Sequence, residues 1–144
     1  MKNLKLSAAV LAGLMVVFSS CKKDKDEAAA PSKSKTEYLT TAKGWKITGF
    51  TIAGQSMFNQ YVDACEKSAL DVYKTGGSYD HTYADKCDED YDGTWKLTNN
   101  DSQIEIDGDT YKIDELNGST FKYSETQSSG GASVTTQYIF TAQK

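Results

Sequence analysis

The sequence predicts an all-β fold, a small antiparallel meander barrel of about eight strands with one short helix. From Leu39 onward, large apolar and polar residues alternate in short runs, which is the period of a strand with one buried face. Turn sequences rich in glycine, asparagine and aspartate separate these runs. A closed barrel would remove the exposed strand edges that such a chain otherwise presents. A flattened β-sandwich is the alternative architecture.

Residues 1–20 have the layout of a secretory signal peptide. Lys2 and Lys5 precede an apolar stretch over residues 6–18, and Ser19 and Ser20 lie just before Cys21. This stretch is shorter than the roughly 20 residues of a membrane span. A cysteine just after the cut resembles the bacterial lipobox, in which the thiol is acylated. We therefore expect Cys21 to carry the lipid that attaches the mature protein to a membrane.

The next segment, residues 21–38, is expected to be the acylated cysteine followed by a flexible charged tether. It contains lysine, acidic residues, alanine and serine, and the only proline of the chain, Pro31. No periodic apolar face is present, so the segment has no means of joining a packed core. The folded domain is then expected to occupy residues 39–144.

The expected strands follow in order along this domain, each with alternating large apolar and polar residues. Asp-Gly and Asn-Gly between two such runs are strong signals of a two-residue hairpin. The runs are found at 45–48, 70–72, 79–83, 95–97, 104–106, 111–113, 121–123 and 138–140, and the turn sequences at 75–77, 99–101, 107–108, 117–118 and 129–131.

One stretch has helical spacing instead. Met57, Phe58, Tyr61 and Val62 recur as they would on one face of a helix, and Ser56 precedes them as a suitable N-cap. The pattern predicts a short helix over 57–64.

Charge excludes some classes of partner. The formal net charge is −4, and all sixteen basic residues are lysine. Removing the two lysines of the signal gives a mature charge of −6, from 14 lysines against 20 acidic residues. Without arginine, nucleic-acid binding and bidentate capture of phosphate are not expected. An acidic domain is not attracted to anionic lipid, so membrane contact should come through the anchor alone.

If Cys21 is acylated, two cysteines remain, Cys65 and Cys87. In an oxidising compartment an even remainder indicates one disulfide, which the chain-entropy model values at roughly 3 kcal/mol for a loop of about 22 residues. A two-cysteine metal or redox site is the alternative, although the chain has no Cys-x-x-Cys and only one histidine, His81.

The order of these features resembles the lipocalin-like lipoprotein domains of Bacteroides-type Gram-negative bacteria. The resemblance covers most of residues 39–144 and is carried by segments 44–48, 65–67, 72–74, 76–79, 86–87, 93–97 and 138–141. It implies an antiparallel barrel with one disulfide and a pocket for a small apolar ligand. The lysines and acids after Cys21 resemble the signal that sends lipoproteins to the outer face of the outer membrane. We therefore expect cell-surface display, with the periplasmic face as the alternative.

Metal and catalytic chemistry have little support. Asp88, Asp90 and Asp92, followed by Gly93, match the start of a calcium loop. A solvated acidic loop is the simpler interpretation, so no cofactor is expected and calcium stays the alternative. A lone His81 and the absence of a Gly-x-Ser-x-Gly motif argue against an enzyme, and we expect no enzymatic activity.

Strand parity assigns the barrel interior. Lys46, Lys96, Lys112 and Lys122 lie between apolar neighbours in four separate runs, and hydration of their charge should turn them outward. The residues of opposite parity should then point inward, either as a filled core or as the lining of a ligand site. These residues are Trp45, Ile47, Trp95, Leu97, Tyr111, Ile113, Phe121, Tyr123, Tyr138 and Phe140.

Two functions are consistent with these features. The first is a non-enzymatic envelope lipoprotein whose barrel binds a small apolar molecule. The second is a protein-binding module, such as a hydrolase inhibitor, that acts through loops at one end of the barrel. An internal cavity would favour the first function, and a filled barrel with a rigid exposed loop would favour the second.

Overall fold

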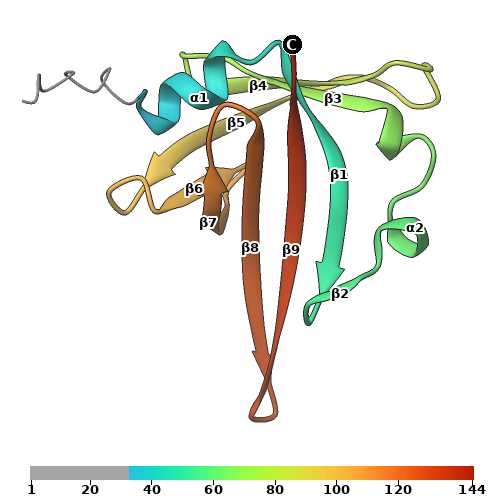
Figure 1. Cartoon of the computed structure of the whole chain (residues 1–144), viewed down its shortest axis with the longest axis vertical. Coiled ribbons are helices and arrows are strands. Elements are labelled where there is room, and N and C mark those ends of the chain that lie inside the picture. The colour runs from blue at the N-terminus through green and yellow to red at the C-terminus, as the bar shows by residue number, and fades with distance from the viewer. Residues whose placement is uncertain (1–32) are drawn as a thin grey trace, which may run out of the picture. The chain divides into compact units, whose positions relative to one another are not determined.

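One nine-stranded antiparallel sheet, closed into a ring, dominates the fold (Figure 1). The computed structural model describes residues 33–144. Strands that are consecutive in the sequence are neighbours in the sheet from β3 to β9, as in a meander. The strands are β1 (Gly44–Ile52), β2 (Gln55–Ser56), β3 (Ala69–Tyr73), β4 (Ser78–Tyr83), β5 (Tyr91–Thr98), β6 (Gln103–Ile106), β7 (Asp109–Leu116), β8 (Thr120–Ser129) and β9 (Ala132–Gln143).

Strand β1 closes the ring by pairing on both sides. Its ladder with β9 runs from Gly44↔Gln143 to Ile52↔Thr136. On the other side, β1 and β3 share a single register pair, Trp45↔Asp71. The predicted barrel is thereby confirmed, and the alternative of a flattened sandwich is wrong because β1 joins β3 and β9 in one continuous sheet.

Most of the turns form where the sequence predicts them. Asp107 and Gly108 form a two-residue hairpin and both have positive φ, 51° and 96°. Gly130 and Gly131 make the equivalent turn between β8 and β9. The Asn-Gly signal at 117–118 gives a three-residue connection instead of a two-residue hairpin, because the Asn117 side chain accepts hydrogen bonds from the backbone N–H groups of Ser119 and Thr120, both at 2.9 Å.

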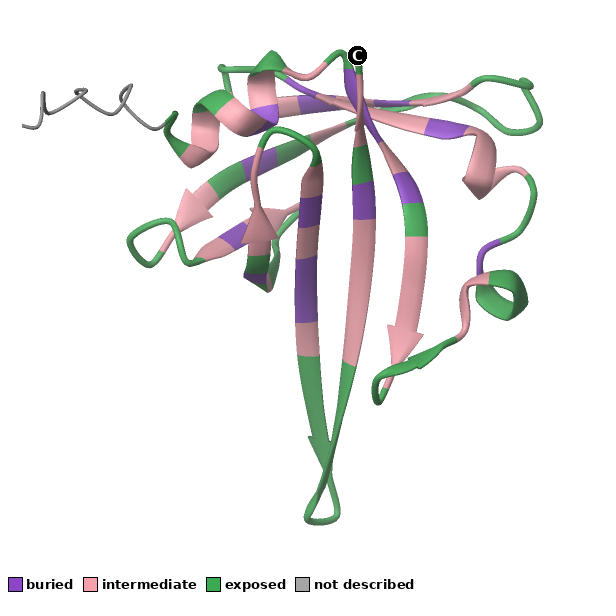
Figure 2. Cartoon of the chain, viewed as in Figure 1, coloured by how far each residue is buried: buried purple, intermediate pink, exposed green. Residues whose placement is uncertain are grey.

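Buried residues alternate with more exposed ones along several strands (Figure 2). All ten residues assigned to the interior are buried or half-buried. Lys96 and Lys122 meet carboxylates of the neighbouring strands at the surface, at 2.7 Å from Glu105 and 2.6 Å from Glu115. The parity prediction is correct for these strands. On β3, for which no inward residues were assigned, Asp71 has the parity of the buried residues Ala69 and Tyr73.

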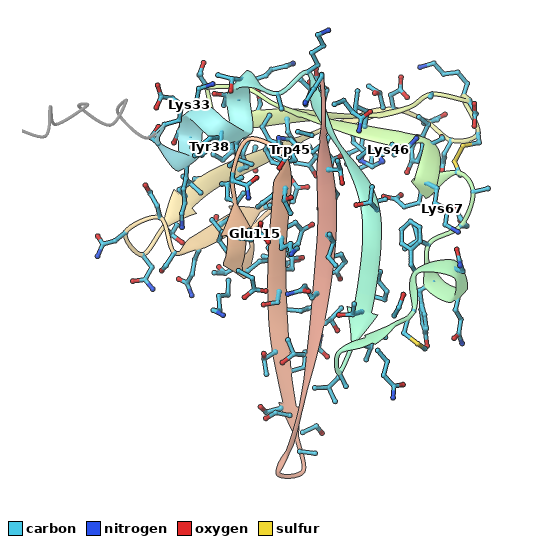
Figure 3. All side chains as sticks on the ribbon, in the orientation of Figure 1. Lys33, Tyr38, Trp45, Lys46, Lys67 and Glu115 are labelled. Carbon is cyan, nitrogen blue, oxygen red and sulfur yellow. A yellow bond between two sulfur atoms is a disulfide. The ribbon has the colours of Figure 1, made fainter. Side chains whose placement is uncertain are left out.

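Helix α1 (Lys35–Thr41) was not expected, and its first turn falls within the segment assigned to the tether. Ser34 and Glu37 form a capping box, which satisfies the free N–H groups at the start of the helix. Leu39 is fully buried, and its carbonyl accepts a hydrogen bond from Nε1 of Trp45 at 3.0 Å. Trp45 lies next to α1 in Figure 3, so this helix covers the part of the core that surrounds Trp45.

The predicted helix over 57–64 is shorter than expected. Helix α2 spans Phe58–Tyr61, and its N-cap position is Met57, which makes no side-chain capping bond. Ser56 pairs with Thr51 in the β1–β2 hairpin, so it is not the cap. A 3-10 helix, η1 (Glu66–Ser68), follows and leads into β3.

Cys65 and Cys87 form the expected disulfide, with a Cα–Cα distance of 5.7 Å (Figure 3). The bond joins the start of η1 to the loop after β4. The signal peptide at 1–20, Cys21 and most of the tether lie outside the described residues. No helix within residues 33–144 is long and apolar enough to cross a membrane.

Reduction of the disulfide should lower the free energy of unfolding by about 2–5 kcal/mol, because the unfolded chain regains the entropy of an open loop. Urea unfolding of the domain with and without reductant measures this difference. The double variant Cys65→Ser/Cys87→Ser is the control, since its midpoint should not respond to reductant. Equal midpoints for the oxidised and reduced wild-type chain would contradict the prediction.

Candidate functional site

Much of the barrel interior is filled by rings packed against one another. Trp45 and Phe121 are fully buried and meet edge to face at 5.7 Å between centroids. Ile113 is buried in the same core, and Tyr111 packs against Tyr123 at 4.9 Å. Aromatic rings already in contact leave no surface for a guest, so this part of the predicted lining is core.

Trp95 and Leu97 are also not part of an internal cavity. The Nε1 group of Trp95 donates to the carbonyl oxygens of Lys74 and Ser78 at 3.1 and 3.0 Å. Together with Leu97 it borders a wide, shallow surface hollow beside Gly76 and Gly77. These hydrogen bonds give Trp95 a structural role at the β3–β4 turn.

A pocket of about 120 Å³ remains between the strands of the barrel. Four residues assigned to the interior line it, namely Ile47, Tyr123, Tyr138 and Phe140. The pocket also has a polar side that the sequence did not predict. Its other lining residues are Glu66, Asp71, Tyr73, Tyr79, His81, Tyr91 and Ile106.

His81, on β4, is the centre of the polar side. Only 4% of its surface is exposed. Its ring stacks on Tyr91 at 4.6 Å and meets the edge of Tyr83 at 4.7 Å. Nδ1 lies 2.6 Å from Oδ1 of Asp71, which is the residue directly opposite on β3. Since a carboxylate only accepts hydrogen bonds, this contact assigns the proton to Nδ1.

The second ring nitrogen has no partner. Within residues 33–144, Nε2 of His81 is the only buried side-chain nitrogen or oxygen that makes no hydrogen bond. The nearest opposite charge is Oε2 of Glu66, at 3.9 Å, which is beyond hydrogen-bonding distance. Leaving a buried polar atom unsatisfied costs about 1–3 kcal/mol, so Nε2 calls for a partner in the pocket, either water or a ligand.

The charges around the pocket shift the pKa values of these groups. Burial alone lowers the pKa of His81, but the hydrogen bond and charge of Asp71, aided by the charge of Glu66, outweigh it and raise the pKa above its ordinary value. Burial and the nearby Asp71 also raise the pKa of the Glu66 carboxyl, against the opposing effect of His81. The site is therefore a set of interacting titratable groups rather than a passive apolar wall.

The tyrosines on the other walls stay neutral. Burial raises the pKa of Tyr73 and Tyr123 well above the ordinary value of the phenol. Burial and a hydrogen bond to Asp107 do the same to the pKa of Tyr79, whose hydroxyl donates to Oδ2 of Asp107 at 2.6 Å. These rings supply flat faces and un-ionised hydroxyl groups.

Gly93 makes room for one of these rings. It pairs with Tyr79 across β4 and β5, and a Cβ atom at position 93 would lie 2.2 Å from the Tyr79 ring. Gly93 and Trp95 are two residues apart on β5 and so lie on the same face of the strand, where packing explains both residues. The glycine admits the Tyr79 ring from the neighbouring strand, and Trp95 then fills the core on the same face.

The segment that carries Glu66 is held from three sides. The disulfide fixes Cys65, the residue before it, and the backbone N–H of Glu66 donates to Asp63 at 2.9 Å. The next residue, Lys67, lies over the ring of Phe58 at 4.9 Å and donates to Asn59 at 3.1 Å (Figure 3). Glu66 is thus presented to the pocket by a braced loop.

The acidic loop is not organised as a calcium site. Asp90 accepts hydrogen bonds from Lys86 at 2.5 Å and from the backbone of Tyr83 at 2.9 Å. Asp88 accepts from the backbone of Glu89, and Asp92 lies on β5 opposite Asp80. In the described part of the chain, no three histidine, cysteine, aspartate or glutamate side chains are grouped to hold a metal ion.

The sequence contained a signal for the missed residues. Tyr79, His81 and Tyr83 share one parity on β4, and Tyr73 and Asp71 share one on β3. Placing the tyrosines inside would also have placed the histidine and the aspartate inside. Glu66 is outside any strand, and the only signal for its position is its place next to Cys65.

The pairing of His81 with Asp71 makes a testable prediction. Asp71→Asn should lower the pKa of His81, because the substitution removes the charge that stabilises the imidazolium. The chain has one histidine, so NMR titration of its ring protons gives an unambiguous reading. The matched control Glu89→Gln, an exposed carboxylate outside the pocket, should leave the pKa unchanged. An equal His81 pKa in Asp71→Asn and wild type would contradict the assignment.

The raised pKa of His81 also makes the stability of the folded domain depend on pH. A raised pKa in the folded state means that protonated His81 stabilises the fold below about pH 6.5. This contribution is lost as the pH rises through the folded-state pKa.

Comparison with known proteins agrees with this architecture. A family model described as a lipocalin-like domain matches residues 42–123. No curated protein matches the sequence. The match covers more than half of the chain, from the start of β1 to the buried part of β8, and β9, which closes the ring, follows the matched region. The chain belongs to the lipocalin-like domain family.

Proposed function

We propose that this protein is a non-enzymatic lipoprotein of the outer membrane that binds a small molecule in the pocket of its barrel. The observation that carries the proposal is the buried, unpartnered Nε2 of His81 in a pocket walled by tyrosines. Lipocalin-like domains are typically binding folds, and they generally take small apolar molecules.

The size of the pocket limits the ligand. A volume of about 120 Å³ is below the roughly 300–1,000 Å³ of typical ligand sites and close to that of a cavity that holds one benzene ring. We therefore narrow the expected apolar ligand to a molecule with one small ring or an equivalent aliphatic body, with a polar group directed at His81. A long acyl chain does not fit this space.

The lining residues favour binding over catalysis. No serine, threonine or cysteine lines the pocket, so His81 has no hydroxyl or thiol nucleophile to activate other than tyrosine. Both cysteines of the domain are joined to each other. The Asp71–His81 pair then serves to orient an imidazole towards a ligand.

Location in the envelope rests on the leader sequence. The signal at 1–20, acylation of Cys21 and the charged tether support a lipid-anchored protein. The resemblance of the residues after Cys21 to an outer-membrane export signal supports display at the cell surface rather than on the periplasmic face.

A second candidate function is protein binding through the β8–β9 hairpin. This hairpin extends well beyond the other strands (Figure 1), and residues 126–135 are all exposed. Its strands stay paired up to Ser129↔Ala132, and hydroxyl pairs such as Thr126–Thr135 link them across the ribbon. Such a hairpin is the structured loop that the alternative function requires.

The anchor can be tested in cells. A palmitate analogue should label the wild-type protein, and Cys21→Ser should abolish labelling, because no acceptor thiol remains at the start of the mature chain. Cys65→Ser/Cys87→Ser, which keeps Cys21, is the matched control and should still be labelled. Labelling of Cys21→Ser at the wild-type level would contradict the lipoprotein assignment.

The pocket can be tested by filling it. Native mass spectrometry of the full chain, purified from its own membranes, should detect a bound small molecule. Ile106→Phe should reduce its occupancy at least about tenfold, because the added ring occupies the pocket. Leu116→Phe is the control, since Leu116 is also half-buried at the edge of the core but does not line the pocket.

Absence of any bound small molecule in the wild-type chain would contradict small-molecule binding. Co-purification of a protein that is lost when the β8–β9 hairpin is shortened would then support the second candidate.

A further inference from the structure

We propose that the ligand of this pocket is an organic amine, whose ammonium group lies between Nε2 of His81 and the carboxylate of Glu66. The inference rests on the proposed small-molecule function and specifies the chemistry of the ligand. It is carried by two acceptors that face one another across a gap, by the charge of the lining and by the aromatic walls.

The gap between the two acceptors fits one bridging atom. Nε2 of His81 and Oε2 of Glu66 are 3.9 Å apart. An atom about 2.8 Å from each would see them at an angle of about 90°, which a tetrahedral donor with several hydrogens can serve. Because Nδ1 keeps its proton for Asp71, Nε2 of the neutral ring is an acceptor. Both acceptors can be satisfied by one atom that donates two hydrogen bonds. An ammonium nitrogen carries three hydrogens and can do this.

The charge of the lining has one sign. Glu66 and Asp71 line the pocket, and no lysine does. The Asp71 side chain is only 13% exposed, so solvent screens its charge weakly. With neutral His81 the lining carries two negative charges, and a cation is the ligand that offsets them.

The tyrosine rings that form the pocket walls also favour an ammonium group. Tyr73 and Tyr79 stack at 5.4 Å, and Tyr91 covers His81. Neutral tyrosine faces attract ammonium groups by about 0.5–2 kcal/mol at such sites. They also pack against the apolar body of a small amine, so the two halves of the ligand have matching surfaces.

Other polar groups match less well. A carboxylate would be repelled by the negative charges of Glu66 and Asp71, and it could accept a hydrogen bond from Nε2 of His81 only if that nitrogen were protonated. A hydroxyl has one proton to donate, so it could donate to Nε2 or to Glu66 but not to both. An amine should therefore bind more tightly than an alcohol or an acid with the same hydrocarbon body.

The pH dependence has a definite sign. His81 is faced by Asp71 from β3, by Glu66 from η1 and by Tyr91 from β5, with Tyr83 on its own strand and Asp90 in the following loop. Protonation of Nε2 replaces its acceptor by a donor and adds a positive charge. Amine affinity should therefore rise with pH through the His81 titration, as long as the amine itself remains protonated.

The test compares three probes with one body on the full chain, by isothermal titration calorimetry: benzylamine, benzyl alcohol and benzoate. Benzylamine should bind at least about tenfold more tightly than the other two at about pH 8, and more weakly at about pH 5.5. Glu66→Gln should weaken benzylamine about tenfold and leave benzyl alcohol within about twofold, since only the cation loses a charge partner. Glu89→Gln removes the same charge outside the pocket and should change neither affinity.

Benzyl alcohol or benzoate binding as tightly as benzylamine would overturn the amine inference and leave small-molecule binding intact. Affinity for benzylamine that is unchanged in Glu66→Gln, or that rises towards acid pH, would also overturn it. Failure of benzylamine to bind would overturn it as well. The proposed function is decided separately, by the native mass spectrum of the chain from its own membranes.

Discussion

The pairing of Trp45 with both neighbouring strands is the contact on which the barrel depends. Its backbone is in register with Asp71 of β3 on one side and with Ala142 of β9 on the other, so the sheet closes at this residue. Its ring is fully buried against Phe121, and its indole N–H is satisfied by Leu39 of α1. Since β1 and β3 share only that one pair, the packing of the Trp45 side chain supports a seam that the backbone ladder alone holds weakly.

The same seam builds the site. Asp71 is the residue of β3 that faces Trp45 in register, and it is also the residue that fixes the proton of His81. The third group, Glu66, is outside the sheet, and the disulfide at Cys65 and the contacts of Lys67 hold it in place. Ring closure therefore positions the histidine, and the cross-link positions the carboxylate that faces it.

The two-residue alternation of apolar and polar side chains was enough to predict the fold and most of the residues inside the barrel. Lys96 and Lys122 are outside and Trp45 and Phe121 inside, as alternation requires when hydrated charge and buried rings share a strand. The polar side of the site was missed because no inward parity was assigned to β3 and β4, so Asp71 and His81 were not placed inside. Burying a carboxylate is costly in isolation, and only the partner strand, with His81 opposite, makes it tolerable. Such a compensation depends on register, which a single strand does not reveal.

Closure by β1 and β9 also governs the order of assembly. The hairpins from β3 to β8 join near neighbours in the chain and can form as soon as they are made. Strand β1 emerges early, yet its longest ladder is with β9, the last strand of the chain. Until β9 arrives, Trp45 and the edge of β1 are exposed to wrong pairing with other chains. Loss of β9 would therefore leave the hairpins of β3 to β8 without a closed barrel, and it would also remove Tyr138 and Phe140 from the pocket wall.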